Sequence, residues 1–397
     1  KLNVPHLRFP EFHGEWEKHG LSEYLDFKNG LNPDSKRFGK GIKFISVMDI
    51  LNNPVITYDC IRASVQATDA EISSFSVENG DILFQRSSET LEDVGRANVY
   101  IDDRVAVFGG FVIRGKKKAN YNPLFFRYLL SSPYARKRII PMGAGAQHFN
   151  IGQEGLSKVS LNFPSIEEQT KIASLLHLLD ERIATQSKLI EDLKKLKSAI
   201  VDYAIDSLDA DFVKFGSLYE TAGEGGTPTT SNAQFYEDGK IPFIKIDDLK
   251  KKYLTENKDF ITELGLQKSS AWLVPSRSIL FSNGATIGEI TITTYPVCTK
   301  QGILGIVPKP NIDVEFLYYF MSSSYFKKAV SRIVTEGTMK TAYLKDINNI
   351  RCPIPIKEKQ QDIAKMPSAL NSKIDFEQSI LKLFGSQKQY LLRQMFM

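Results

Sequence analysis

The chain has 397 residues, of which 42% are hydrophobic and 24% charged, and its formal net charge is +5 at pH 7. This length predicts two or three domains, and the composition is ordinary for a soluble globular protein. No apolar run approaches the roughly 18 residues that span a membrane, which argues against a membrane protein. The small positive charge indicates a nucleic-acid partner only weakly, because no segment forms a basic tail.

The cysteines and the opening segment predict a compartment. Cys60, Cys298 and Cys352 are scattered without the spacing of metal ligands. They are typical of buried thiols in a reducing compartment. The opening KLNVPHLRFPEF contains no apolar segment of the kind found in a signal peptide. The sequence therefore predicts a cytoplasmic protein.

Short apolar or β-branched runs, bounded by Gly, Asn or Pro, predict strands in the first part of the chain. They cover residues 43–47, 81–84 and 105–113. An amphipathic helix is expected over residues 122–130, and the serines that follow are expected to end it.

A long helix is the clearest predicted element. Pro164 and Ser165 precede the acidic Glu167 and Glu168, which suits the first turn of a helix. Apolar residues then recur at alternating steps of four and three, with Gln186 as the polar member of the series. The apolar positions are Ile172, Leu176, Leu179, Ile183, Ile190 and Leu193. This seam is typical of a coiled coil, and it predicts a helix that runs to about residue 203.

The second half of the chain repeats the first. The motif P-x-x-E-x-Q-x-x-I-A occurs at Pro164 and again at Pro355, 191 positions later. The segment PLFFRYLLSSPY (123–134) likewise matches VEFLYYFMSSSY (314–325) at the same distance. A period this long predicts a duplicated domain rather than a solenoid.

The repeated half contains the same predicted elements. Strands are expected at 279–281, 289–293 and 303–307, and a short helix at 313–321. The second long helix has its own seam, with Glu377 as its polar member. The apolar positions are Ile363, Leu370, Ile374, Leu381 and Phe384. Pro367 takes the place of Leu176, so we expect a kink or a late helix start there.

The predicted fold class is α+β, a tandem duplication of two globular α/β domains separated by two long helices. The helices are expected to pack as an antiparallel coiled coil with pseudo-two-fold symmetry, because each narrow seam alone would leave an apolar stripe exposed. In the alternative, each helix packs only on its own domain. The expected globular domains are 1–163 and 209–354, and the helical spacers are 164–208 and 355–397. Each globular part should hold a mixed or antiparallel sheet, since no β-α-β alternation is present.

The opening VPHLRFPEFHGEWE, the two P-x-x-E-x-Q-x-x-I-A motifs and the tandem architecture resemble the specificity (S) subunit of a type I restriction-modification system. The resemblance covers essentially the whole chain. It implies two target recognition domains and a helical spacer, and a protein that binds double-stranded DNA at a bipartite target. It also implies a part in phage defence.

The resemblance further implies partners and cofactors. Two methylation subunits would dock on the chain to make a DNA adenine methyltransferase, and two restriction subunits could join to give an ATP-dependent endonuclease. The chain itself would be no enzyme and would bind no metal or cofactor. S-adenosylmethionine, ATP and Mg would be bound by the partner subunits.

Catalytic motifs are missing from the sequence, as a DNA-reading subunit would predict. We find no G-x-x-x-x-G-K-[ST] phosphate loop, no N/D-P-P-Y/F motif and no G-x-G-x-x-G. GEGGTPTTS (223–231) is interpreted as a loop, and its resemblance to the family's Gly-Thr-Pro stretch favours contact with the DNA backbone. Asp247, Asp248, Glu256 and Lys258 form the nearest nuclease-like pattern, which is also common on protein surfaces. The histidines do not cluster, and His177 is interpreted as a structural residue on or beside the packed face of the long helix.

Three alternatives remain open at this stage. The chain could serve a related system in which one fused methyltransferase-nuclease is the partner. It could be a coiled-coil scaffold whose two domains bind protein or ligand rather than DNA. It could also be a self-sufficient nuclease that uses Asp247 and Glu256.

Candidate DNA contacts lie in loops that follow equivalent strands of the two copies. Arg or Lys can read guanine and Asn or Gln can read adenine through paired hydrogen bonds. The predicted loop contacts are Gln85, Arg86, Ser87, Ser88, Gln147, His148, Asn150, Thr227, Lys245, Ser282, Asn283, Lys300, Gln301, Thr338, Lys340 and Thr341. The predicted phosphate contacts are Lys36, Arg37, Lys40 and Lys43, which would position DNA without specifying its sequence. Each of these residues could instead be an ordinary solvated loop residue.

Overall fold

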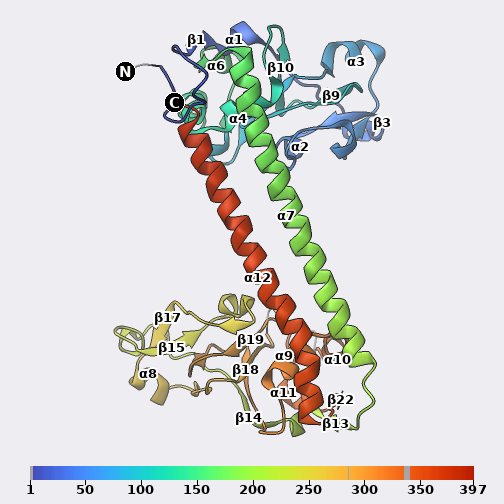
Figure 1. Cartoon of the computed structure of the whole chain (residues 1–397), viewed down its shortest axis with the longest axis vertical. Helices are drawn as coiled ribbons and strands as arrows, with labels where there is room; N and C mark the ends of the chain where they lie inside the picture. The colour runs from blue at the N-terminus through green and yellow to red at the C-terminus, as the bar shows by residue number, and fades with distance from the viewer. Residues whose placement is uncertain (1–2, 285, 335–339) are drawn as a thin grey trace. The chain divides into compact units, whose positions relative to one another are not determined.

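The structure is a computed structural model that describes residues 3–284, 286–334 and 340–397 (Figure 1). The chain divides into two compact units. Unit 1 comprises Lys1–Ser187 and Ile380–Met397, and unit 2 comprises Lys188–Ser379. Each unit has its own large hydrophobic core. Within the described ranges, no helix has the length and apolar character needed to span a bilayer.

The globular part of unit 1 contains two four-stranded sheets. The first is antiparallel with the order β2-β10-β6-β8, and the second has the order β4-β3-β9-β5, with β3 and β9 parallel. The short pairs β1·β12 and β7·β11 are antiparallel. The strands are β1 (Glu17–Gly20), β2 (Leu25–Asn29), β3 (Phe38–Ile45), β4 (Ser64–Val65), β5 (Ser76–Val77), β6 (Ile82–Gln85), β7 (Ser87–Ser88), β8 (Ala97–Val99), β9 (Ala106–Phe108), β10 (Val112–Lys117), β11 (Phe149–Asn150) and β12 (Ser160–Phe163). The short helices are α1 (Leu21–Tyr24), α2 (Val47–Asn52), α3 (Asp69–Phe75), α4 (Pro123–Ser131), α5 (Pro133–Ile139) and α6 (Gln153–Ser157).

The globular part of unit 2 has a related plan. A five-stranded sheet has the order β14-β21-β18-β19-β16, and a three-stranded sheet has the order β17-β15-β20. The pairs β16·β19 and β15·β20 are parallel, so the sheets are mixed as predicted. The strands are β13 (Phe212–Lys214), β14 (Tyr219–Glu224), β15 (Ile241–Ile244), β16 (Tyr253–Leu254), β17 (Asp259–Ile261), β18 (Ile279–Ser282), β19 (Ile290–Thr293), β20 (Cys298–Thr299), β21 (Ile303–Pro308) and β22 (Arg351–Pro353). The helices are α8 (Glu263–Gln267), α9 (Val314–Ser322), α10 (Ser324–Ile333) and α11 (Leu344–Ile347).

Strand register shows how closely the two globular parts correspond. Val112 of β10 pairs with Gln85 in unit 1, and Ile303 of β21 pairs with Ser282 in unit 2. The parallel pair β3·β9 of unit 1 has its counterpart in β15·β20 of unit 2. The two parts therefore share one topology, which confirms the predicted duplication and makes residues equivalent by position.

The glutamine of the duplicated motif forms two side-chain hydrogen bonds to backbone groups in both copies. In unit 1 the Gln169 side chain accepts from the Asn122 amide at 3.0 Å and donates to the Pro164 carbonyl at 3.0 Å. In unit 2 the Gln360 side chain accepts from the Asp313 amide at 2.8 Å and donates to the Pro355 carbonyl at 2.8 Å. Each glutamine thus fastens the start of a long helix to the start of a short helix. A buried amide that satisfies backbone groups at both of its ends explains why both copies carry glutamine here.

The serines after the short helices end them, as predicted, and each serine also begins a second helix that sequence reasoning missed. Ser132 ends α4 and begins α5, and Ser323 ends α9 and begins α10. Each serine has extended backbone geometry, and its side chain accepts from the amide three residues later. One residue can therefore break the helix axis and also cap the helix that follows.

Two predicted strands have different bounds in the structure. The run 105–113 is split into β9 and β10 by a turn at residues 109–111. The run 43–47 belongs to β3, which starts earlier and ends at Ile45, because α2 begins at Val47. Apolar periodicity continued across both breaks, since the residues on either side are buried.

The two long helices are α7 (Ile166–Asp206) and α12 (Lys357–Gln394) (Figure 1). In unit 1 the start of α7 lies beside the end of α12, where Lys388 forms an ion pair of 2.5 Å with Asp180. In unit 2 the later part of α7 lies beside the early part of α12, where Lys197 donates to the Asn371 side chain at 2.9 Å. Within each unit the helices therefore run antiparallel.

The predicted seam positions are buried or half-buried on both helices. Ile172, Leu176, Leu179, Ile190 and Ile374 are buried, whereas Ile183, Leu193, Ile363, Leu370, Leu381 and Phe384 are half-buried. The four-three spacing therefore identified the packed face of each helix.

Of the two outcomes expected at Pro367, a kink or a late helix start, the structure excludes the late start. Helix α12 begins at Lys357 and includes Pro367 in its interior. Proline lacks one amide donor, so it removes one helical hydrogen bond without preventing the turns on either side. Its ring is buried on the same face as Ala364 and Asn371, where packing within unit 2 stabilises the helix.

Candidate DNA interface

Two of the predicted loops of unit 1 come together in the structure. Strands β7 and β11 pair with Ser87 opposite Asn150, and the Ser87 hydroxyl donates to the Asn150 side chain. The Ile151 amide donates to the Arg86 carbonyl at 2.9 Å. The segments 85–88 and 147–150 therefore form one surface, although about 60 residues separate them in the chain.

Two further segments of unit 1 join this surface, and sequence reasoning missed both. The turn 109–111 is held by Arg86, whose amide donates to the Phe111 carbonyl at 2.9 Å and whose guanidinium donates to the Gly110 carbonyl at 3.2 Å. The segment 29–33 packs against the same turn, and a Cβ on Gly30 would lie 2.1 Å from the Gly109 carbonyl oxygen. The sequence does contain a signal for segment 29–33. By strand register this segment is equivalent to the Gly-Thr-Pro loop of the second copy, so aligning the two copies could have identified it.

The equivalent segments of unit 2 converge in the same way. The Asn283 amide donates to the Gly302 carbonyl at 3.0 Å, and the Gln301 amide donates to the Thr227 hydroxyl at 3.4 Å. The Ala342 amide donates to the Asn283 carbonyl at 2.9 Å, which brings Lys340 and Thr341 to the same place. Thr338 lies outside the described residues.

Some of the predicted contact residues hold these loops together from the inside. Gln85, Ser282 and Asn283 are buried. The side-chain amide of Gln85 donates to the Ser87 carbonyl at 2.9 Å, and the side-chain amide of Asn283 donates to the Ala342 carbonyl at 3.3 Å. The Ser282 hydroxyl accepts from the Glu289 amide at 2.8 Å. These side chains shape the loops from within.

Other predicted residues remain accessible to a large ligand. Gln147, His148, Asn150, Lys245, Lys300, Gln301 and Lys340 are exposed, and Arg86, Ser87, Ser88, Thr227 and Thr341 are half-buried. Lys245 also forms an ion pair of 2.7 Å with Asp259. Both loop surfaces therefore present amide, hydroxyl and cationic groups of the kinds that bind base edges and phosphates.

The lysine and arginine residues of segment 36–43 divide into two groups. Lys36 and Lys40 are exposed. Arg37 instead forms a fork on Glu71, with one bond of 3.0 Å, and hydrogen bonds from Arg37 lower the pKa of the Glu71 carboxyl to about 2. Lys43 donates to the Ile61 carbonyl at 2.6 Å. Arg37 and Lys43 thus have structural partners within unit 1.

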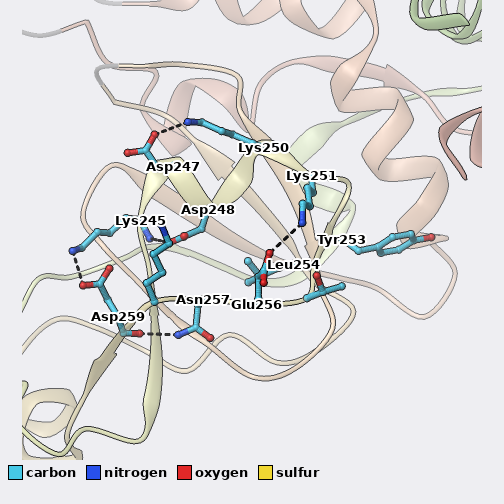
Figure 2. Close-up of a pocket in the computed structure, with 12 residues that line it drawn as sticks. Lys245, Asp247, Asp248, Lys250, Lys251, Tyr253, Leu254, Glu256, Asn257 and Asp259 are labelled. Atoms are coloured by element: carbon cyan, nitrogen blue, oxygen red, sulfur yellow. Dashed lines mark hydrogen bonds and ion pairs between the residues drawn. The ribbon is translucent and has the colours of Figure 1, made fainter. Parts of the chain in front are cut away.

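The nuclease-like acids line a polar cavity of about 720 Å³ in unit 2 (Figure 2). Asp247 pairs with Lys250 at 2.9 Å, and Glu256 pairs with Lys251 at 3.1 Å. Figure 2 shows that these pairs point to different sides of the cavity. Across residues 3–284, 286–334 and 340–397, no group of three or more His, Cys, Asp or Glu side chains is placed to hold a metal ion. The arrangement is that of a charged surface pocket with internally paired groups.

His177 is not on the packed face of α7. Its side chain is partly exposed and lies 3.6 Å from Glu181, one helical turn away. His177 therefore lies beside the packed face, next to the buried Leu176 and Leu179, which is one of the two predicted placements.

The family model described as "Type I restriction modification DNA specificity domain" matches the chain twice, over residues 13–195 and 208–383. Each match contains one globular part and the first part of one long helix. The chain therefore belongs to this family, and its two copies of the domain stand in tandem.

Relatives of known type support the same assignment. The chain is 24% identical to the putative type I restriction enzyme MjaX specificity subunit of Methanocaldococcus jannaschii, over 94% of this chain and 91% of that protein. It is 23% identical to the HindI specificity subunit of Haemophilus influenzae, over 82% of this chain and 86% of that protein. A crystal structure of the type I system S subunit from M. genitalium has the same fold, with a TM-score of 0.58 at 17% identity over 99% of both chains.

Proposed function

We propose that the chain is the DNA-reading subunit of a type I restriction-modification complex. It binds double-stranded DNA at a bipartite target, and each globular part reads one half. The observation that carries this proposal is the convergence of equivalent loops in both units, one surface in each, at the ends of equivalent strands.

The residue types on these surfaces support base reading. Lys300 and Gln301 in unit 2 can form paired hydrogen bonds to purines in the major groove. In unit 1 Arg86 has further donors besides the one bonded to the Gly110 carbonyl, whereas Asn150 would have to exchange its bonds to Ser87 and His148 for bonds to a base. Lys36 and Lys40 would contact phosphates. Gln85, Ser282 and Asn283 would fix the loop shapes, because their side chains already bond to neighbouring backbone groups.

In this proposal the chain supplies no catalytic group. In the unit 2 cavity Asp247, Glu256 and Asp259 each pair with a lysine, and the Asp248 carboxylate accepts from the Lys245 backbone amide. Two methylation subunits would dock on the chain and bind S-adenosylmethionine. Restriction subunits would join the full complex and bind ATP and Mg, and the complex would act in the cytoplasm.

The proposal is tested by co-expressing this chain with the methyltransferase gene that neighbours it, in a host without adenine methylation. Methyladenine is then mapped by long-read sequencing. The expected result is a two-part motif with a fixed gap that disappears when the chain is omitted. A soluble complex with an active methyltransferase and no such motif would contradict the proposal and favour a scaffold that binds other ligands.

A further inference from the structure

Unit 1 has an apolar pocket beside its loop surface. Its volume is about 470 Å³, and its walls include Leu31, Phe38, Phe44, Met48 and Phe111. Three of these side chains are strongly exposed for their size: Phe111 is 68% exposed, Met48 61% and Phe38 43%. Large apolar side chains gathered around one exposed hollow indicate a binding site, whereas single exposed ones need no explanation.

Phe111 has no role in the core. It stands at the tip of the turn between β9 and β10, where its neighbours Phe108 and Val112 are both fully buried. The main chain of Phe111 is nevertheless fixed, because its carbonyl accepts from the Arg86 amide at 2.9 Å. A rigid turn thus holds an aromatic ring out toward solvent, next to the proposed reading loops.

The surroundings of the pocket suit DNA. Ser87, one of the proposed reading residues, lines the pocket together with Phe111. Of the described residues that line it, none is acidic. Lys36 and Lys40 are exposed on either side of Phe38 in the sequence. An apolar hollow without acidic lining residues, one wall of which comes from a segment with two exposed lysines, complements a base edge between two phosphate strands.

Unit 2 differs at the equivalent positions. Strand register makes Gly302 the counterpart of Phe111. The Asp49 carboxylate accepts from the Ser46 backbone amide, and the Asp248 carboxylate accepts from the Lys245 backbone amide in the same way. Asp49 and Asp248 are therefore equivalent. The residues before them, Met48 and Asp247, are equivalent as well. The apolar pair of unit 1 is therefore replaced by a glycine and a carboxylate. The two halves of the target should then differ in the chemistry by which they are read.

We propose that Phe111 and Met48 determine specificity in unit 1 by contacting the 5-methyl group of a thymine in the major groove. Apolar side chains recognise thymine through this methyl group, which distinguishes it from the other bases. The inference rests on the proposed function. It predicts a thymine in the half-site that unit 1 reads, recognised through its methyl group. Unit 2 has no apolar pair at the equivalent positions and should not recognise a thymine methyl there.

The test uses the full chain in complex with its methyltransferase subunit, once the motif has been mapped. Each thymine of the unit 1 half-site is replaced in turn by deoxyuridine, which removes only the methyl group. Binding is measured by fluorescence anisotropy at one fixed salt concentration. One replacement should weaken binding of the unsubstituted chain by about 3- to 10-fold, as expected for one buried methyl. The same replacement should weaken binding of Phe111→Ala by less than about twofold.

Met48→Ala provides a second variant on a separate element, in case the turn does not tolerate Phe111→Ala. Val105→Ala is the matched control, because Val105 is an exposed apolar residue at the opposite end of β9. This control should keep the full penalty for the missing methyl.

Three results would overturn the inference. In the first, deoxyuridine weakens DNA binding by Phe111→Ala and by Met48→Ala as much as it weakens binding by the unsubstituted chain. In the second, no replacement of thymine by deoxyuridine weakens binding by the unsubstituted chain. The substitutions could also release the methyltransferase subunit or change self-association, which would make the pocket a protein-docking surface. Failure of the proposed function is a distinct result, since the unsubstituted complex would then show no specific DNA binding.

Discussion

At the scale of single residues, neighbouring cations in segment 36–43 have separate roles. Arg37 and Lys43 are held by Glu71 and by the Ile61 carbonyl, whereas Lys36 and Lys40 are exposed. A cation already bonded within its own unit has less to gain from a phosphate, because it must give up that partner. The segment should therefore contribute two phosphate contacts rather than four.

Replacing both Lys36 and Lys40 by alanine should lower the salt dependence of DNA binding. Each lost phosphate contact reduces the slope of log K against log salt concentration by about 0.9, so the double variant should lose about 1.8. Its sequence preference should not change, because phosphate contacts carry no base information. Fluorescence anisotropy of the chain–methyltransferase complex over a salt series measures both quantities. Lys43→Ala is the control and should leave the slope unchanged; an equal loss there would contradict the division into two groups.

The buried cysteines give a pH-dependent prediction. Burial raises the pKa of the Cys298 thiol to about 11 and that of Cys352 to about 12. The thiolate is the reactive form, and a raised pKa reduces its fraction at any pH below that value. At pH 8 iodoacetamide should therefore modify the half-buried Cys60 alone in the folded protein, and all three cysteines in urea. Mass spectrometry counts the adducts, and native labelling of Cys352 at the rate of Cys60 would show that the core is open.

At the scale of elements, the repeated glutamines connect helices that meet at the edge of each globular part. Gln169 joins α7 to the residue that caps α4, and Gln360 joins α12 to the residue that caps α9. The glutamine hydrogen bonds therefore fix the start of each long helix relative to the short helix of the same unit. Such a joint favours rigid attachment of each globular part to its own helix segments.

Gln169→Ala should lower the free energy of unfolding of unit 1 by about 2–3 kcal/mol, because the Asn122 amide and the Pro164 carbonyl both lose their partner. The chain has two tryptophans, so Trp272→Phe leaves Trp16 in the core of unit 1 as the reporter. Urea unfolding followed by its fluorescence measures the change. Glu167→Ala, at an exposed position of the same motif, should cost less than about 1 kcal/mol. Equal losses in the two variants would show that the glutamine hydrogen bonds are not the source of stability.

At the scale of the whole molecule, the two units have separate cores and separate loop surfaces. The loop residues of one unit make their hydrogen bonds within that unit, as Ser87 with Asn150 and Gln301 with Thr227 illustrate. Base reading by one unit should then be independent of the sequence of the other.

Exchange of residues 1–163 for those of a relative with another target should alter one half of the methylated motif and leave the other half unchanged. Exchange of residues 209–354 should alter the other half alone. Long-read mapping of methyladenine identifies both halves in one experiment. A change in both halves after a single exchange would mean that the reading surfaces are coupled.

The sequence alone identified the duplication, the two long helices and the face on which they pack. These features are one-dimensional: a repeat can be aligned with itself, and a seam at steps of four and three requires only the geometry of a single helix. The same self-comparison located the loops 85–88 and 282–283 after equivalent strands, and the structure brings each together with its predicted companion loop.

Tertiary structure decided which residues of those loops face outward. Gln85 and Asn283 have the side chains of base readers, but their positions beside the turns 109–111 and 300–302 bury them. The exposed position of Phe111 also became visible only in the fold, since apolar periodicity predicted a continuous strand there. Burial and hydrogen bonding depend on partners tens of residues away, whereas periodicity and self-similarity are properties of the chain itself. This is why the architecture could be predicted and the outward-facing residues of the loops could not.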